Sequence, residues 1–257
     1  MANNSLGIIQ SRGLGDIIIA IPIAHYYHKQ GRKIIWPVCE EFWPSVKDHV
    51  TWVQWVPIPM DSKGDFFYTE PMKRLKNFGC TDTICLYQSL NVVPELSKVP
   101  WFQIQHFDEF KYTKAAVPFL NKWTLNECIT RNLEKEEELY RRLVETPDYY
   151  VTHLEGSNFK CAPDLSSVPA EWQRINITSG ITSSVFDWLT IIEKCQALIC
   201  VDSVISNMVD QLKIDSIDKY WIPRSHIHLT PVLGTEWTML EPPEGSGAAQ
   251  KIFTAVP

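Results

Sequence analysis

The stretch Leu6-Gly-Ile-Ile-Gln-Ser-Arg-Gly-Leu-Gly-Asp16 decides the fold that this sequence predicts. Its first part, Leu6 to Gln10, is a short apolar run of the kind found in buried strands. A turn with two glycines follows, and an apolar helical stretch then runs from about Asp16 to Gln30. Lys33 to Val38 has the composition of a second strand. Strand, glycine turn, helix and strand form a βαβ unit, so we expect an α/β protein with a parallel sheet.

The middle of the chain carries the pattern of one long helix. Between Glu127 and Glu145, apolar residues recur at helical spacing and charged residues fill the remaining positions. Pro147 follows, and proline cannot continue a helix. We therefore expect the domain boundary at this point, with an N-terminal domain of residues 1–146 and a C-terminal domain of residues 147–257.

The second half repeats the strand-turn-helix order of the first half. Ala197 to Val201 reads as a buried strand, and Asp202 or Ser203 then caps a helix from Val204 to Leu212. The order predicts a second Rossmann-like domain that faces the first across a cleft. Further strand candidates are Val50–Val56, Thr83–Tyr87, Trp101–Phe107, Tyr149–Leu154, Arg174–Thr178, Lys219–Ile222 and His226–Leu229.

Composition excludes several classes of protein. The 257 residues include 24 Lys and Arg against 30 Asp and Glu, for a net charge of −6, so general polyanion binding is not expected. None of the seven cysteines forms a Cys-x-x-Cys pair, which predicts reduced thiols without a zinc site or disulfide framework. The longest apolar run, Ile17 to Ala24, is too short to span a bilayer. With no secretory leader at the start of the sequence, we expect a cytoplasmic protein.

The loop that ends in Asp16 is the first candidate site. Ligands of open α/β sheets bind where strands end, and Gly13 and Gly15 let the backbone approach such a ligand closely. The third glycine of a dinucleotide fingerprint is missing, since Ile18 follows, so an NAD site is disfavoured. The alternative interpretation makes Asp16 a helix cap and the glycines turn formers.

Two further candidate sites lie in the second half. Asp202 and Ser203 stand at a predicted helix start, where free N–H groups and a hydroxyl suit a diphosphate. His153 and Lys160 flank the end of the first strand of this half, and either could contact a phosphate. Each pattern also has a plain structural interpretation, as a helix cap in the first case and a strand end with a surface lysine in the second.

Taken together, these patterns resemble the bacterial heptosyltransferases, which are ADP-heptose transferases of glycosyltransferase-B fold. Gly15-Asp16, followed by Pro22 six residues later, is similar to the start of that family. Phe186 to Cys195, the strand Ala197 to Val201 and the turn Asp202-Ser203 are similar to its second half. The family has Gly and then His after Asp-Ser, whereas Val204 and Asn207 stand here. The chain is also shorter than typical members, which implies a shortened second domain.

The resemblance implies a role for each matching residue. Asp16 would be the general base that accepts a proton from the acceptor hydroxyl. A metal-independent site would bind the nucleotide-sugar donor, which is a substrate, and no cofactor is expected. The implied donor-binding residues are Gly13, Gly15, His153, Lys160, Asp202, Ser203 and Asn207.

The expected function is therefore sugar transfer from a nucleotide sugar to an acceptor hydroxyl. The acceptor would be a glycan or, in a viral protein, a hydroxymethylated DNA base, and no obligate protein partner is inferred. Two alternatives stay open. One is a sugar-nucleotide epimerase or hydrolase on the same fold, and the other is a non-catalytic nucleotide-binding relative.

Overall fold

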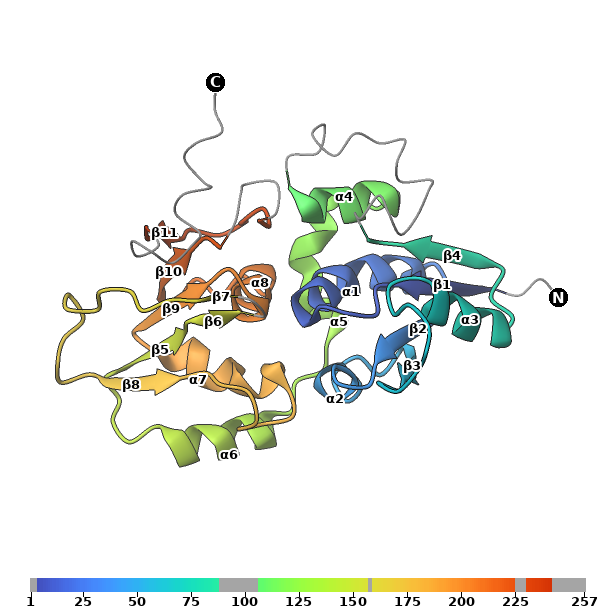
Figure 1. Ribbon diagram of the computed structural model, residues 1–257. Coiled ribbons are helices and arrows are strands. Elements are labelled where there is room, and N and C mark those ends of the chain that lie inside the picture. Colours follow the sequence, from blue (N-terminus) through green and yellow to red (C-terminus); the bar gives the residue numbers. More distant parts are fainter. Residues whose placement is uncertain (1–3, 88–105, 157–158, 225–229, 242–257) are drawn as a thin grey trace, which may run out of the picture. The chain divides into compact units, whose positions relative to one another are not determined.

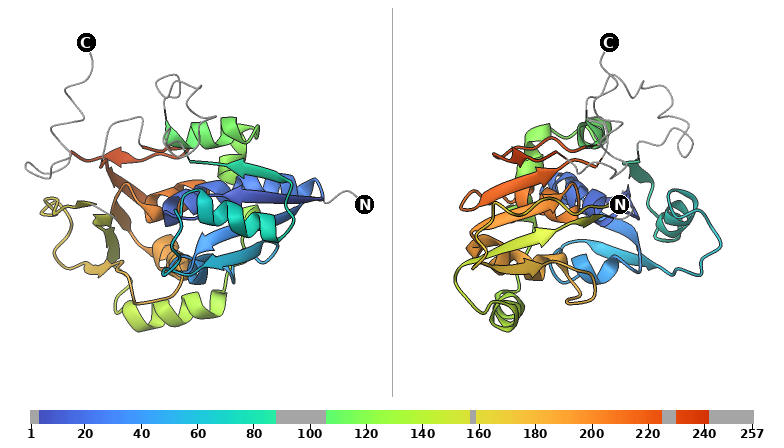
Figure 2. Two further views of the ribbon diagram at one scale, coloured as in Figure 1. Left: turned by 45° about the vertical axis from the view of Figure 1, so that its right-hand side comes forward. Right: turned by 60° about the vertical axis from the view of Figure 1, so that its left-hand side comes forward.

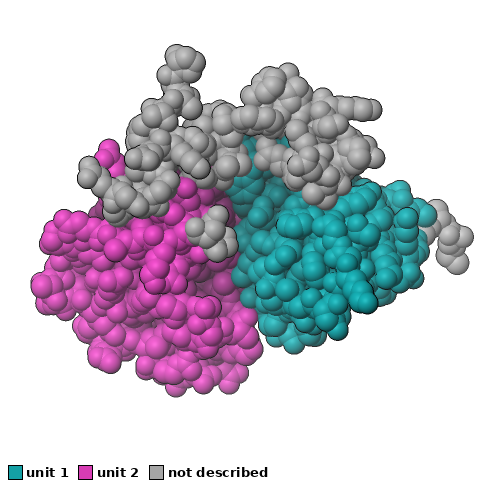
Figure 3. Space-filling view, in the orientation of Figure 1, with its two compact units in different colours: residues 1–130 teal, residues 131–257 magenta. Residues whose placement is uncertain are grey.

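The computed structural model describes residues 4–87, 106–156, 159–224 and 230–241. The chain divides into two compact units, residues 1–130 and 131–257, which Figure 3 shows in teal and magenta. Each unit is built around a parallel sheet with helices, so the expected α/β class is confirmed. That the units face a common cleft stays a prediction.

The first unit contains a four-stranded sheet in the order β3-β2-β1-β4, and every pair in it is parallel. Its strands are β1 (Ser5–Ile9), β2 (Lys33–Cys39), β3 (Gln54–Ile58) and β4 (Asp82–Cys85). The strand expected at Val50–Val56 starts later than predicted. Val50 is buried, but in the loop before β3, which shows that an apolar residue enters the core without belonging to the sheet.

Helices of the first unit cover both faces of this sheet (Figure 1). α1 (Leu14–Lys29) links β1 to β2, and α3 (Thr69–Asn77) links β3 to β4 in the opposite direction along the sheet. Because such crossovers share one hand, the two helices lie on opposite faces. α3 approaches β1 so closely that a Cβ on Gly7 would stand 2.6 Å from the side chain of Leu75.

The remaining helices of the first unit are short. They are α2 (Trp43–Val46), α4 (Phe107–Lys114), η3 (Phe119–Thr124) and α5 (Leu125–Cys128). α4, η3 and α5 all pack against α1. α1 itself continues unbroken through Pro22, and its residues from Ile17 to Ala24 are buried. This apolar helix therefore forms the centre of the unit rather than an amphipathic cover.

The second unit contains a parallel sheet in the order β11-β10-β9-β5-β8. Its strands are β5 (Tyr149–His153), β8 (Gln173–Asn176), β9 (Ala197–Val201), β10 (Asp218–Ile222) and β11 (Thr238–Met239). β6 (Glu155–Gly156) and β7 (Phe159–Lys160) form a separate antiparallel pair directly after β5. The strand expected at His226–Leu229 lies outside the described residues.

The two faces of the second sheet are covered differently. α8 (Val204–Gln211), η4 (Val185–Trp188) and α7 (Leu189–Lys194) follow its strands, and α6 (Leu133–Leu143) packs on α7 and η4 along one outer side (Figure 2). The apolar cluster that contains Ala197 and Ile199 is covered by Leu165, Val168 and Trp172, which belong to the segment before β8. In the described part of this segment, an irregular loop, and not a helix, covers this apolar cluster.

The long helix expected between Glu127 and Glu145 is two helices, α5 and α6. Ile129 adopts an extended conformation that separates them. Thr130 is tied to the first unit, since its N–H donates to the carbonyl of His49 at 2.7 Å. Arg131 belongs to the second unit, where it pairs with Glu136 and Glu193. The division at 130/131 therefore falls well before the expected boundary at 146/147, because α6 packs with the second sheet's helices.

Helices long and apolar enough to cross a membrane are absent from the described part of the chain. All seven cysteines are buried free thiols. The strand expected at Trp101–Phe107 falls mostly outside the described residues, and its last residue, Phe107, begins α4.

The Arg131 ion pairs predict a measurable loss of stability. Arg131→Met would leave the fully buried Glu136 carboxylate without its guanidinium partner. We expect the free energy of unfolding to fall by about 3 kcal/mol, the low end for a buried pair with one partner removed, because the Arg131 side chain is 29% exposed. Lys29→Met is the matched control, because the Lys29–Glu127 pair is about half exposed. It should cost less than about 1 kcal/mol in the same urea titration. Equal losses for the two variants would contradict the prediction that the Arg131–Glu136 pair contributes more to stability than the exposed Lys29–Glu127 pair.

Candidate active site

Each sheet has one place where the direction of the chain connections reverses. Ligands of open α/β sheets bind at the carboxyl ends of the strands at such a switch point. In the first unit the switch point lies between β1 and β4, and in the second it lies between β5 and β9. Asp16 follows the end of β1, Asp202 and Ser203 follow the end of β9, and His153 is the last residue of β5. The residues expected at the candidate sites therefore lie near the two switch points, and their role in a site stays a prediction.

At the first switch point, Asp16 pairs with Lys111 of α4. Lys111 Nζ lies 2.9 Å from Asp16 Oδ1, and the lysine side chain is buried whereas that of Asp16 is 39% exposed. The same ammonium donates to Gln10 Oε1 at 2.8 Å and to the carbonyl of Leu86 at 3.1 Å. These acceptors follow β1 and β4, so one cation joins both strand ends to the first turn of α1. Asp16 is held in place while part of its carboxylate stays accessible.

A buried phenol holds the loop before Asp16. The hydroxyl oxygen of Tyr87 accepts the backbone N–H groups of Ser11 and Arg12, each at 2.8 Å. Burial raises the pKa of Tyr87 far above its usual value, so the phenol stays protonated. Phe67 packs edge-on against this ring, and the Arg12 guanidinium lies over Phe66. The Tyr87 hydroxyl therefore fixes the backbone of the loop just before α1 begins.

Gly13 is required by two independent constraints. Its φ of +79° lies in the region that side chains rarely adopt, and a Cβ there would stand 2.6 Å from Asp16 Oδ2. Gly13 is also the N-cap residue of α1, and its carbonyl accepts the N–H of Ile17 at 2.9 Å. Gly15 is the second residue of the helix. The absence of a side chain at Gly13 thus leaves space for the Asp16 carboxylate.

At the second switch point, His153 and Ser203 meet. His153 Nδ1 lies 2.9 Å from Ser203 Oγ, which also accepts the N–H of Ile205 as the N-cap of α8. Ser206 completes the cap of α8, because its hydroxyl accepts the N–H of Ser203 at 2.9 Å. Asp202 is buried between β9 and α8. Three predicted residues are thus close to one another.

Burial is the main cause of the low basicity of His153. The pKa of the imidazole is lowered to about 4 by burial, with an opposing contribution from Glu155 and a smaller lowering contribution from Arg224. His153 is therefore neutral at pH 7 and its Nδ1 can accept or donate a hydrogen bond, depending on the tautomer.

Asn207 and Lys160 have contrasting surroundings. Asn207 is buried, and its Nδ2 donates to the carbonyl of Ser203 at 2.8 Å. Its Oδ1 is buried without a hydrogen-bond partner among the described residues. Lys160 stands on β7 with its side chain 78% exposed, and it pairs with Glu155 across the short hairpin. Asn207 is part of the α8 start, whereas Lys160 is a surface residue of the β6–β7 hairpin.

Three residues at these sites were missed by the sequence interpretation. Lys111 lies in a stretch of mixed aromatic and polar residues that showed no clear periodicity, and no local pattern marks it. Tyr87 ended a predicted strand and was taken as part of it. Arg224 follows β10, and it lies 3.9 Å from Asp202 through its Nε. The position of an arginine just after a strand of a parallel sheet is the one pattern that could have found it.

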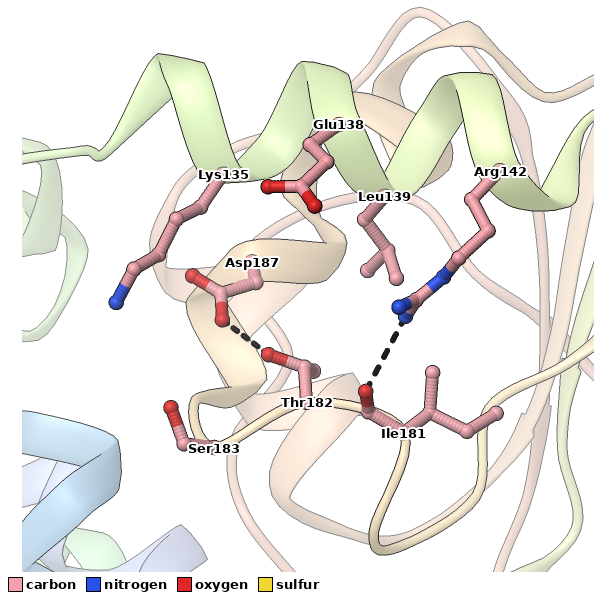
Figure 4. A pocket seen from close by; sticks show the side chains of 8 residues that line it. All are labelled: Lys135, Glu138, Leu139, Arg142, Ile181, Thr182, Ser183 and Asp187. Atoms are coloured by element: carbon pink, nitrogen blue, oxygen red, sulfur yellow. Dashed lines mark hydrogen bonds between the residues drawn. The ribbon is translucent and has the colours of Figure 1, made fainter.

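A small polar pocket of about 180 Å³ lies elsewhere in the second unit (Figure 4). It lies between α6 and the loop before η4, and Arg142 donates to the carbonyl of Ile181 across it at 3.2 Å. Asp187 accepts the Thr182 hydroxyl on the same side. Its lining residues include none of the predicted site residues. Clusters of three or more His, Cys, Asp or Glu that could hold a metal ion are absent among residues with described positions.

Comparison with solved structures places the fold. A glycosyl transferase of family 9 from Veillonella parvula DSM 2008 matches with a TM-score of 0.56 and 13% identity, over 94% of this chain and 88% of that one. This chain therefore has the fold of a family 9 glycosyltransferase. The resemblance expected from Asp16, Pro22 and the Asp202-Ser203 turn is confirmed at the level of the fold.

Two Escherichia coli structures match with lower scores. The heptosyltransferase WaaC with ADP-2-deoxy-2-fluoro heptose gives a TM-score of 0.47 and 11% identity, over 96% of each chain. The iron-containing dodecameric glycosyltransferase TibC gives 0.48 and 12%, over 85% of this chain and 57% of that one. No family model and no curated protein sequence matches this chain.

Gly13→Ala is expected to disturb both the helix start and Asp16. The left-handed backbone and the close approach to Asp16 Oδ2 predict a loss of about 1–2 kcal/mol in the free energy of unfolding. Gly31→Ala is the matched control, since Gly31 has a similar φ of +82° but open space around its Cβ position. Thermal unfolding should show the larger loss for Gly13→Ala. A larger loss for Gly31→Ala would refute the role of the Asp16 contact.

His153 predicts a pH-dependent term in stability. The unfolded chain takes up a proton on this ring near pH 6.5, whereas the folded chain does so only at about 4. Protonation therefore favours unfolding, and the stability contributed by neutral His153 is lost as pH falls from about 6.5 to 4. His153→Gln should remove this loss, which amounts to about 3 kcal/mol between pH 7 and pH 4. Urea titrations of both proteins between pH 4 and pH 7 measure it, and parallel curves would contradict the prediction.

Proposed function

We propose that this protein is a metal-independent glycosyltransferase that moves a sugar from a nucleotide-sugar donor to an acceptor hydroxyl. The proposal rests on one observation above all, which is the Asp16 carboxylate held by a buried lysine at a switch point of the sheet. The fold shared with a family 9 glycosyltransferase supports it. The acceptor in this proposal is a glycan or a hydroxymethylated DNA base.

Asp16 acts as the general base in the proposed reaction. Its carboxylate accepts the proton of the acceptor hydroxyl while the acceptor oxygen forms a bond to the anomeric carbon. The bond from that carbon to the diphosphate oxygen breaks, and the nucleoside diphosphate leaves with the electron pair. Lys111 does not touch the substrate. It is a positioning residue, since its ammonium binds Asp16 Oδ1 while 39% of the Asp16 side chain stays exposed.

The second unit binds the donor in this proposal. The start of α8 carries the positive end of a helix dipole, which favours the developing charge on the leaving diphosphate. Ser203, His153 and Asn207 lie at this helix start and provide polar contacts. Asp202, Lys160, Gly13 and Gly15 complete the proposed donor-binding set.

Asp16→Asn tests the proposed base. The amide keeps the shape of the side chain but cannot take the proton, so the transfer rate should fall at least about 100-fold. Donor binding should persist, because Asp16 serves the acceptor. Transfer is measured as nucleoside diphosphate released with each acceptor type, after a thermal-shift screen with UDP-, GDP-, ADP- and CMP-linked sugars has identified the donor.

Asp82→Asn is the matched control for this experiment. Asp82 is also an aspartate paired with a cation, Arg32, but it begins β4 and so lies at the opposite end of the strands. Its substitution should leave transfer unchanged. Full activity of Asp16→Asn would disprove the mechanism. Donor turnover that needs no acceptor would favour the epimerase or hydrolase alternative, and no thermal shift with any nucleotide sugar would remove the donor-binding claim.

A further inference from the structure

Arg224 follows β10 at the carboxyl edge of the second sheet. β10 ends at Ile222, next to β9, and the backbone N–H of Asp202 donates to the carbonyl of Ile222 at 2.9 Å. Arg224 Nε lies 3.9 Å from Asp202 Oδ2. The guanidinium is thus placed beside the turn that begins α8, although it comes from a different strand.

The backbone of β6 approaches the same guanidinium. A Cβ on Gly156 would stand 2.6 Å from Arg224 Nη1 and 3.2 Å from its Cζ, so a side chain at position 156 would displace the end of the arginine. Arg224 also contributes to the lowered pKa of His153, which shows that its charge acts on the His153–Ser203 pair. Three strand ends therefore surround this side chain, and 25% of it remains exposed.

The partly buried surroundings of Arg224 differ from those of Lys160. The Lys160 side chain is 78% exposed and paired with Glu155 on a two-residue strand, so nothing holds it toward α8. A guanidinium is planar, always charged and able to bind two phosphate oxygens at once. The Arg224 side chain is one quarter exposed, its Nε is buried, and its Nη1 lies beside the backbone of Gly156.

We infer that Arg224 is the cation that binds the diphosphate of the nucleotide donor at the start of α8, with Asp202 and Gly156 holding it in place. This inference rests on the proposed function and assigns the charge that the proposed function requires. Arg224 compensates the nearby Asp202 carboxylate, which would otherwise repel a diphosphate. It thereby makes the α8 start an anion site despite the acid next to it.

The test compares ligands that differ only in phosphate. Calorimetry first identifies the nucleoside diphosphate, among UDP, GDP, ADP and CDP, that binds the wild-type chain most tightly. Its affinity is then compared with that of the corresponding nucleoside. Arg224→Gln should weaken diphosphate binding about 10- to 100-fold, the range of a lost charged hydrogen-bond pair, and leave nucleoside binding unchanged. A purely structural arginine would weaken both ligands together.

Two more variants keep the result interpretable. Gly156→Ala retains the charge but pushes the guanidinium aside, so it should reduce the same diphosphate preference without removing the arginine. Arg141→Gln is the control, because Arg141 is an exposed residue of α6 whose Nε donates only to the carbonyl of Glu137 among the bonds described. It should leave both affinities unchanged.

The failures are distinguishable. If the wild-type chain binds none of the four diphosphates, the proposed function fails and this inference fails with it. If the wild-type chain binds one of them and Arg224→Gln keeps the full preference over the nucleoside, the inference about Arg224 is overturned while the donor site stands.

Discussion

The ammonium of Lys111 is the interaction on which the first unit's site depends. Removing a charge from water costs several kcal/mol unless opposite charge and hydrogen bonds replace the water. Here Asp16, Gln10 and the carbonyl of Leu86 do so. Each of these partners belongs to a different chain segment. Burying the Lys111 ammonium therefore requires the ends of β1 and β4 and the first turn of α1 to lie close together. The accessible carboxylate is a consequence of that requirement.

The second unit reaches a comparable result with different groups. Its switch point holds a neutral imidazole, a capping hydroxyl and a helix start, and the nearby charges are Asp202 and Arg224. In the proposed function, the first site provides a carboxylate that takes up a proton, whereas the second provides a helix start and the Arg224 guanidinium for an anion. A reaction that removes a proton from one substrate and releases a diphosphate from the other needs this division of charge.

Local patterns predicted the elements that bury a continuous apolar run. β1, α1 and β2 were expected within one or two residues, β9 was expected as found, and Ser203 was one of the two expected caps of α8. The prediction of one long charged helix from its helical spacing was wrong. α5 and α6 read as one helix because helical spacing continues across Ile129, although its backbone is extended. The expected domain boundary shifted for the same reason, since α6 joins the second sheet.

The sequence by itself determined the α/β class, the two strand-turn-helix sites and the candidate base Asp16, because these features depend on neighbours in the chain. Tertiary structure alone decided which side chains surround them. Lys111 stands 95 positions after Asp16 in the sequence, and Arg224 comes after a strand that is two strands away from β5. Such contacts follow from strand order and from the need to pair a buried charge, and neither condition leaves a local pattern for the sequence to display.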